Sequence, residues 1–378
     1  MECMVVAPTL VPMATWGREG ECPRPARGLP MDWARTILFN QRGMMAEKNA
    51  ILDKEWPDPL VPPEVIMARA PWITPPVLSR LAFAPARLID VATFVTSQEN
   101  ACRFCYGALR TMMRLSGYSD EQIRDLERDV QLADGVTREV VSLSRKLARS
   151  TPRPVKEELE ALQRLGLDYK AVAEIVFLVA FTCYTNRIGT FLSLPPDRKF
   201  ERAVENPIKR LLFSMMFRFS PMRTRRMGPS SPVDADGALA PLVKALPEAP
   251  AAAWFAGLVE SCFSAPAIPR RTKLLMLAVI ARTLGCGFCE EAARADLEGL
   301  GLDRGGFART LDSLSGPGVG PQDALLLDWA RETVRYETGP IQKRVRALAA
   351  SVNTDVVLEA VATAAVSNTA VRLAMLLG

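Results

Sequence analysis

Apolar residues recur along most of this chain at the spacing of one helix face, three and four positions apart. The pattern extends almost without interruption from residue 75 to residue 193 and also covers residues 31–53. Its breaks are Gly117, Gly135, Pro152 and Pro154 in the longer segment and the prolines from Pro57 to Pro63 after the shorter one. No segment alternates between apolar and polar residues over the length of a strand. The pattern therefore predicts an all-α protein.

Prolines, glycines and changes in composition divide the chain into four predicted segments. Residues 1–30 mix proline, glycine, methionine and cysteine and predict a weakly structured lead-in. Residues 31–200 and residues 251–378 predict two helical domains in tandem. Between them, residues 201–250 predict a linker that contains one apolar and basic helix.

The apolar and basic stretch of the linker covers residues 209–227 and allows two interpretations. Its first part is apolar on most sides of a helix, and its second part carries Arg223, Arg225 and Arg226. Apolar and cationic residues together are typical of a helix that lies on an anionic membrane surface. The stretch lacks the clean polar face of such a helix. That favours the other interpretation, a helix buried between domains or in an oligomer with the arginines at its exposed end.

Two Cys-x-x-Cys pairs, at Cys102–Cys105 and Cys286–Cys289, stand 184 residues apart in similar surroundings. Twelve residues after each pair comes a glycine, Gly117 or Gly301, that predicts the end of a helix and is followed by a capping residue. Each half closes with an apolar helix that runs from a glutamate to an arginine. These helices are Glu174 to Arg187 and Glu359 to Arg372. Agreement at several landmarks with a nearly constant offset indicates a duplication.

The composition removes several classes of function. The 378 residues include no histidine, which excludes a Ser-His-Asp triad, a Cys-His dyad and histidine metal ligands. A net charge of +5 without a basic and aromatic motif gives no support for nucleic-acid binding. No secretion signal and no uninterrupted apolar run of membrane-span length is found, so we expect a cytoplasmic protein without a transmembrane span. Nothing in the sequence indicates a cofactor or a bound metal.

Each cysteine pair is predicted at the beginning of a helix, where cysteines three apart share one face and can form a disulfide. Free backbone N–H groups and the helix dipole there lower the pKa of a thiol. Asn100 and Gly285 are the predicted capping residues. Beside the first pair, Arg103 adds positive charge and Tyr106 a hydroxyl, whereas Glu290–Glu291 disfavour a thiolate at the second. The first pair is therefore the predicted better nucleophile.

Residues 75–195 and 255–378 resemble the alkylhydroperoxidase D-like branch of the carboxymuconolactone decarboxylase superfamily. The resemblance rests on the apolar helix that leads into Cys-x-Phe-Cys, the glycine turn with its Ser or Asp cap, and the late helix ending near Asn186-Arg187. It implies two tandem domains of this all-α type in one chain. It also implies a homo-oligomer; a trimer of two-domain subunits would reproduce a ring of six domains.

The resemblance also implies roles for the cysteines. Cys105 and Cys289 would attack a peroxide, and Cys102 and Cys286 would resolve the product into a disulfide. A small dithiol or a thioredoxin-like protein would then reduce that disulfide. The family's carboxylate and histidine relay positions hold Asp90 and Leu109 in the first half and Leu274 and Ala293 in the second. Loss of a general base costs about 10²–10⁴-fold in rate. Slow chemistry at the first pair, with Asp90 as proton acceptor, and a degenerate second pair are the expectations.

The leading functional hypothesis is a thiol-dependent oxidoreductase, a weak peroxidase or disulfide exchanger that acts chiefly in the first domain on a small peroxide or disulfide. One alternative brings the four motif thiolates to a structural zinc ion. A second is a superfamily member without redox chemistry that serves as a scaffold or ligand-binding protein. A third is a biosynthetic enzyme whose polar pocket includes Asp90, Glu174 and Arg187. For Glu174 the favoured use is a helix cap. For Arg187 it is a contact at the helix end or an ion pair.

Overall fold

In the computed structural model, residues 50–378 form one compact unit. The structure describes residues 51–73, 81–128, 135–218, 237, 239–246, 250–316 and 318–377. Three predicted features lie outside these ranges. They are the lead-in at 1–30, the helical stretch before residue 51, and Arg223, Arg225 and Arg226 of the linker.

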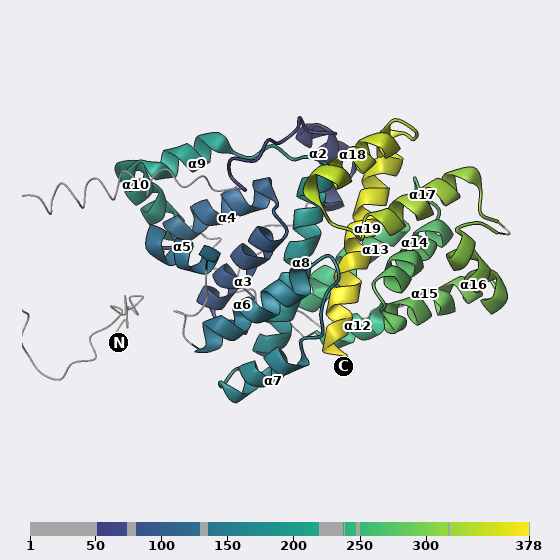
Figure 1. The fold of residues 1–378 in the computed structure, drawn as a ribbon, viewed down its shortest axis with the longest axis horizontal. Coiled ribbons are helices and arrows are strands. Elements are labelled where there is room, and N and C mark those ends of the chain that lie inside the picture. Colours follow the sequence, from purple (N-terminus) through teal and green to yellow (C-terminus); the bar gives the residue numbers. More distant parts are fainter. Residues whose placement is uncertain are drawn as a thin grey trace, which may run out of the picture. The chain divides into compact units, whose positions relative to one another are not determined.

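Every regular element in the described ranges is a helix, which confirms the all-α prediction (Figure 1). The first half contains α3 (Ala86–Glu99), α4 (Arg103–Leu115), α5 (Asp120–Arg128), α6 (Gly135–Ala148), α7 (Lys156–Arg164) and α8 (Tyr169–Phe191). The second half contains α14 (Arg270–Thr283), α15 (Gly287–Gly299), α16 (Arg304–Ser313), α17 (Pro321–Glu332), α18 (Thr338–Ala349) and α19 (Thr354–Leu373). The other helices are α2 (Pro63–Arg69), η1 (Pro71–Ile73), α9 (Arg198–Glu205), α10 (Pro207–Arg218), α12 (Ala240–Ala245), α13 (Pro250–Ser264) and η3 (Ala374–Leu376).

The order of the helices supports a duplication. Each of the six helices of the second half begins 182 to 186 residues after its counterpart in the first half. In both halves the cysteine pair lies at the turn between the first and second helices of the set. Apolar residues of the two halves nevertheless belong to one buried core within the unit 50–378. The division of this unit into two domains therefore stays a prediction.

The two longest helices, α8 and α19, pack against each other and form the middle of this unit (Figure 1). The Thr369 hydroxyl of α19 lies 3.3 Å from the Ala180 carbonyl of α8. By length and composition alone, residues 169–191 and 354–376 could cross a membrane, but 94% and 100% of their most apolar windows are buried inside the structure. Core helices pass the same test, so this finding is weak support for a membrane span.

Two glutamates of the central helices hold equivalent turns. The Glu174 carboxylate accepts three backbone N–H groups of residues 82–84, at 2.7 to 2.9 Å, just before α3. The Glu359 carboxylate accepts those of residues 267–268, at 2.7 and 2.8 Å, just before α14. In the second half the fully buried Lys273 adds an ion pair with Glu359 at 2.7 Å. The glutamates therefore anchor the turns that precede α3 and α14 by accepting backbone hydrogen bonds.

The helix ends that follow the cysteine helices have the predicted form. Gly117 and Gly301 adopt φ angles of 95° and 85°, a left-handed conformation that glycine reaches without a Cβ clash. The hydroxyl of Ser119 and the carboxylate of Asp303 then accept the backbone N–H three residues further on, at 3.1 and 2.6 Å. These polar side chains begin α5 and α16 by satisfying an N–H group that lacks an intrahelical partner.

The predicted linker contains part of α9, α10 and α12. Five large apolar residues of α10 are 54% to 78% exposed, so the prediction of a helix buried between domains is wrong for these residues. They are Ile208, Leu211, Leu212, Met215 and Met216. The physical reason is that α10 lies at the edge of the unit, against α9 and α4, which cover only its other face (Figure 1). Two interpretations remain for the exposed apolar face of α10: contact with a membrane surface, or contact with a second copy of the chain.

Candidate functional site

A tight turn presents each cysteine pair. The turn between α3 and α4 passes through Ala101, whose φ of 47° is left-handed, and the equivalent turn passes through Gly285 with a φ of 70°. Glycine adopts this conformation freely, whereas a residue with a Cβ is strained by about 1–2 kcal/mol. The first turn therefore stores strain directly beside its cysteines, and the second does not.

The first cysteine of each pair is itself the N-cap of the helix that follows, in place of the predicted Asn100 and Gly285. The Cys102 sulfur accepts the backbone N–H of Cys105 at 3.3 Å, and the Cys286 sulfur accepts that of Cys289 at 3.4 Å. In the first pair the sulfurs are 2.8 Å apart, about 0.8 Å beyond a disulfide bond. The first pair is therefore a free dithiol placed for disulfide formation.

The first dithiol is sealed inside the protein. Cys102 is fully buried and Cys105 is 8% exposed. A Cβ added to Gly189 of α8 would lie 3.3 Å from the Cys102 sulfur and 3.5 Å from that of Cys105, so this glycine makes room for both. Since a larger residue would have to displace the sulfurs, the position is suited to a small side chain only.

Two buried hydroxyls, Tyr336 and Thr190, form a chain that leads to the first dithiol. The Tyr336 hydroxyl lies 2.6 Å from the Thr190 hydroxyl and 3.0 Å from the Asn186 carbonyl. Thr190 in turn donates a hydrogen bond to the Cys102 sulfur and lowers the pKa of that thiol. Sequence reasoning missed both hydroxyls, because 146 residues separate Tyr336 from Thr190 and neither stands in a motif.

The pKa values of the first pair move in opposite directions. Burial raises the pKa of Cys102, but hydrogen bonds from Cys105, Thr190 and the Phe104 backbone N–H outweigh it, so the pKa is lower than the ordinary 9.0. Burial raises the pKa of Cys105 well above that value, and the hydrogen bond to Cys102 and the charge of Cys102 add to the rise. Cys102 is therefore the thiol of the pair with the lower pKa, whereas resemblance assigns the attack to Cys105.

In the second pair, too, the first cysteine has the lower pKa, and this cysteine is more accessible to solvent than its counterpart in the first pair. A hydrogen bond from the Cys289 side chain is the main cause that lowers the pKa of Cys286 to about 7; burial opposes it, and backbone N–H groups of Cys289 and Phe288 assist. The same hydrogen bond, with burial, raises the pKa of Cys289 far above its ordinary value. Cys286 is partly exposed, and Cys289 is buried. A substrate in solution can therefore reach the thiolate of the second pair.

The charge expected to activate the first pair is neutralised. The Arg103 guanidinium forms a two-pronged ion pair with the Glu201 carboxylate of α9, at 2.8 and 2.7 Å. The Tyr106 hydroxyl donates to Glu127 of α5. Both side chains therefore point to other helices and already have partners. The prediction that the first pair is the better nucleophile therefore loses its main support.

The carboxylates beside the second pair are paired as well. Glu290 lies 2.7 Å from the Arg282 guanidinium, which also binds Asp312. Glu291 forms an ion pair with Arg294 one turn along α15. Because each negative charge has a cationic partner, these glutamates do not raise the pKa of Cys286. The destabilisation of a thiolate that the sequence predicts at the second pair is therefore absent.

Asp90 lies far from the turn that carries the first pair. An α-helix rises 1.5 Å per residue, so the nine residues from Asp90 to Glu99 place it about 14 Å along α3 from the end next to Cys102. The groups that lie against the two sulfurs come from α8 and the beginning of α4. The role of Asp90 as proton acceptor therefore stays a prediction.

The arginines that close α8 and α19 behave differently. Arg372 donates to the carbonyls of Leu147 and Arg149, at 2.8 and 2.7 Å, and so caps the C-terminal end of α6. Arg187 instead lies over the Tyr336 ring at 4.7 Å, and its Nε and Nη2 atoms have no hydrogen-bond partner. Burial, with repulsion from Arg372, lowers the pKa of Arg187 to about 10. A buried cation with spare donors thus lies beside the hydroxyl chain.

The other described cysteines do not join either pair. Cys183 and Cys262 are fully buried in α8 and α13, as the core interpretation of these residues predicts. Within the described ranges no three cysteine or carboxylate side chains lie close enough together to hold a metal ion. The two motif pairs are therefore not assembled around a common zinc ion in this structure.

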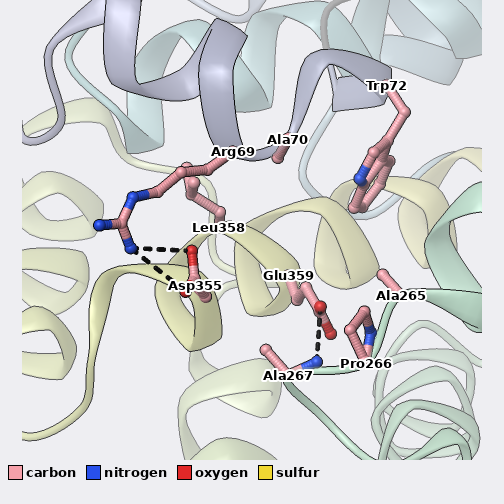
Figure 2. Close-up of a pocket in the computed structure, with 9 residues that line it drawn as sticks. All are labelled: Arg69, Ala70, Trp72, Ala265, Pro266, Ala267, Asp355, Leu358 and Glu359. Carbon is pink, nitrogen blue, oxygen red and sulfur yellow. Dashed lines mark hydrogen bonds and ion pairs between the residues drawn. The ribbon is translucent and has the colours of Figure 1, made fainter.

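A cavity of about 520 Å³ lies apart from both dithiols (Figure 2). It is bounded by the end of α2, by η1, by the turn after α13 and by the first turns of α19. Arg69 and Asp355 form an ion pair at 3.2 Å on one side, and the Trp72 ring lies on the other. The Glu359 carboxylate faces the cavity but already binds the turn before α14. The cavity thus combines an apolar wall with one ion pair.

Comparisons with protein-family models, with curated proteins and with solved structures found no match to this chain.

Proposed function

We propose that this protein is a thiol-dependent oxidoreductase in which the N-cap cysteine of a Cys-x-x-Cys pair attacks a small disulfide or peroxide. The observation that carries the proposal is the shared arrangement at both pairs: the first sulfur accepts the backbone N–H of the second cysteine, and its pKa is lowered. Access favours Cys286 as the first residue to react, because it is partly exposed and its pKa is about 7.

The proposed reaction is a two-electron oxidation of the dithiol. With a disulfide substrate, the Cys286 thiolate attacks one sulfur, a mixed disulfide forms and the other substrate sulfur leaves as a thiolate. Cys289 then attacks the Cys286 sulfur, and its proton goes to the departing second thiolate. With a peroxide, Cys286 becomes a sulfenic acid as an alcohol or water leaves, and attack by Cys289 releases water. A small dithiol or a thioredoxin-like protein would restore the pair.

The second step is the slow one in this proposal. The raised pKa of Cys289 keeps that thiol protonated, and the chain has no histidine to take its proton. The group that leaves must therefore take the Cys289 proton. A thiolate leaves more readily than the hydroxide of a sulfenic acid because it is the weaker base, so disulfide exchange is favoured over peroxide reduction. The resemblance to alkylhydroperoxidase D-like proteins is consistent with either reaction.

The test is thiol counting with mass mapping on the reduced protein before and after a stoichiometric pulse of hydroxyethyl disulfide or hydrogen peroxide. The proposal expects a Cys286–Cys289 disulfide that is absent in Cys286→Ser, a variant whose hydroxyl keeps the N-cap. Cys262→Ser changes a buried cysteine outside the motifs and serves as the matched control. Oxidation of both pairs no faster than free cysteine would reject the redox function.

A second candidate function is the binding of a small molecule in the cavity of Figure 2. Its volume, the Trp72 face and the Arg69–Asp355 pair suit a ligand with an apolar body and one polar end. Calorimetric titration with the fluorescent probe 8-anilinonaphthalene-1-sulfonate tests this. Leu358→Trp fills the cavity and should weaken binding at least about ten-fold, whereas Leu325→Trp, on a partly exposed site of α17, should not. Equal binding by both variants would reject the site.

A further inference from the structure

One face of α10 is apolar and uncovered. Its large residues lie at positions three and four apart, which share one side of a helix. They are Ile208 (78% exposed), Leu211 (63%), Leu212 (57%), Met215 (54%) and Met216 (61%), and are called the apolar stripe below. The opposite side of α10 is attached to the protein, since the Phe213 ring meets Phe200 of α9 edge-on at 5.9 Å. The stripe therefore points away from the core.

The chain around the stripe is strongly basic. Residues 198–227 contain nine lysines and arginines and two glutamates, a net charge of +7, whereas the whole chain has +5. The remaining 348 residues are thus slightly acidic. One of the two glutamates, Glu201, is already neutralised by Arg103. Exposed cations next to the stripe include Lys199, Arg202 and Lys209. The whole excess of positive charge therefore lies in the segment of the sequence that contains the exposed apolar helix.

We propose that the apolar stripe of α10 docks onto the surface of an anionic lipid bilayer. A helix of twelve residues is about 18 Å long, too short to cross the hydrocarbon core, but long enough to lie in the interface with its apolar side toward the acyl chains. Basic residues near an anionic surface add roughly five-fold to binding each. Apolar burial and charge attraction together provide the two signals that stable peripheral binding needs.

The charge distribution disfavours a second copy of the chain as the cover of the stripe. A two-fold dimer through this face would place the described segment 198–218, with a net charge of +4, against its own copy, and like charges in contact oppose association. An anionic lipid surface turns the same charge into attraction. The apolar stripe contains neither cysteine pair, so its binding to a bilayer does not depend on the thiol chemistry.

Flotation of the full-length protein with vesicles tests the inference. Binding to phosphatidylcholine–phosphatidylglycerol vesicles should exceed binding to phosphatidylcholine vesicles by at least about ten-fold and weaken as salt is raised. The double variant Leu211→Glu/Met215→Glu should lose at least about ten-fold of that binding. Leu300→Glu, at the 48% exposed leucine that directly follows α15, is the matched control and should bind as the parent does.

Three results would overturn the inference. One is the absence of flotation with anionic vesicles. Another is equal binding of the double variant and the parent. The third is a dimer, measured by sedimentation equilibrium, that the double variant dissociates while vesicle binding is absent in both; the stripe would then be a contact between copies. Thermal unfolding of all variants checks the fold, and because the mutated side chains are 48% to 63% exposed, it should be unchanged.

Discussion

The substitution Cys289→Ala tests the electrostatic basis of the proposed chemistry. The hydrogen bond from the Cys289 side chain is the main cause that lowers the pKa of Cys286 to about 7 from an ordinary 9.0. Alanine removes this donor and leaves the two backbone N–H groups of residues 288 and 289 in place. The pKa of Cys286 should therefore rise toward 9.

The shift has opposite consequences for reactivity at low and at high pH. At pH 7, a thiol with a pKa of about 7 is half ionised, against about 1% for a pKa of 9. Each thiolate of the lower pKa is roughly eight-fold less nucleophilic, because the Brønsted slope is about 0.4–0.5. Complete loss of the shift would therefore slow alkylation by about six-fold at pH 7 and speed it by about eight-fold at pH 10.

The assay is the rate of alkylation of Cys286 by iodoacetamide between pH 6 and pH 10, followed by peptide mass spectrometry. The parent rate should rise with pH and level off just above pH 7, whereas that of Cys289→Ala should keep rising. Cys262→Ala, at a buried cysteine outside the pairs, controls for the loss of a thiol. An unchanged midpoint in Cys289→Ala would refute the hydrogen bond as the cause of the lowered pKa.

Three further predictions concern the surroundings of the pairs. Tyr336→Phe keeps the ring over the buried guanidinium but removes a hydroxyl from the chain to Cys102. The Cys102 pKa should rise, seen in the ultraviolet absorbance of the thiolate against pH, and an unchanged titration would exclude the chain. Gly285→Ala should lower the free energy of unfolding by about 1–2 kcal/mol in urea, while Ala101→Gly should not lower it; equal losses would contradict the strain argument. Lys273→Met leaves a buried carboxylate unpaired and should cost about 3–5 kcal/mol by the same measurement, a loss below 1 kcal/mol being the contrary result.

Several features could be predicted from the sequence because neighbouring residues encode them. Apolar spacing predicts the helices, and the glycines at 117 and 301 end them where the left-handed conformation is required. The duplication is visible at the same positions in sequence and in helix order. The location of each cysteine pair at a helix beginning is also local, since a cap involves only the next three residues.

The reactivity of the cysteines depends on contacts between distant segments, and there the sequence-based ranking of the two pairs loses its support. Arg103 suggests an activating charge until Glu201, 98 residues away, is found to neutralise it. Tyr336 reaches the first pair from the other half of the chain. Burial hides Cys102 and leaves Cys286 accessible, a difference that no local pattern contains.

The sequence by itself therefore determined an all-α chain with a Cys-x-x-Cys pair at the start of a helix in each half. Only the tertiary structure decided which sulfur of each pair has the lower pKa and which pair a substrate can reach. The physical reason is that helix formation and capping depend on nearest neighbours along the chain, whereas the pKa and the exposure of a thiol depend on the hydrogen bonds and desolvation that folding creates.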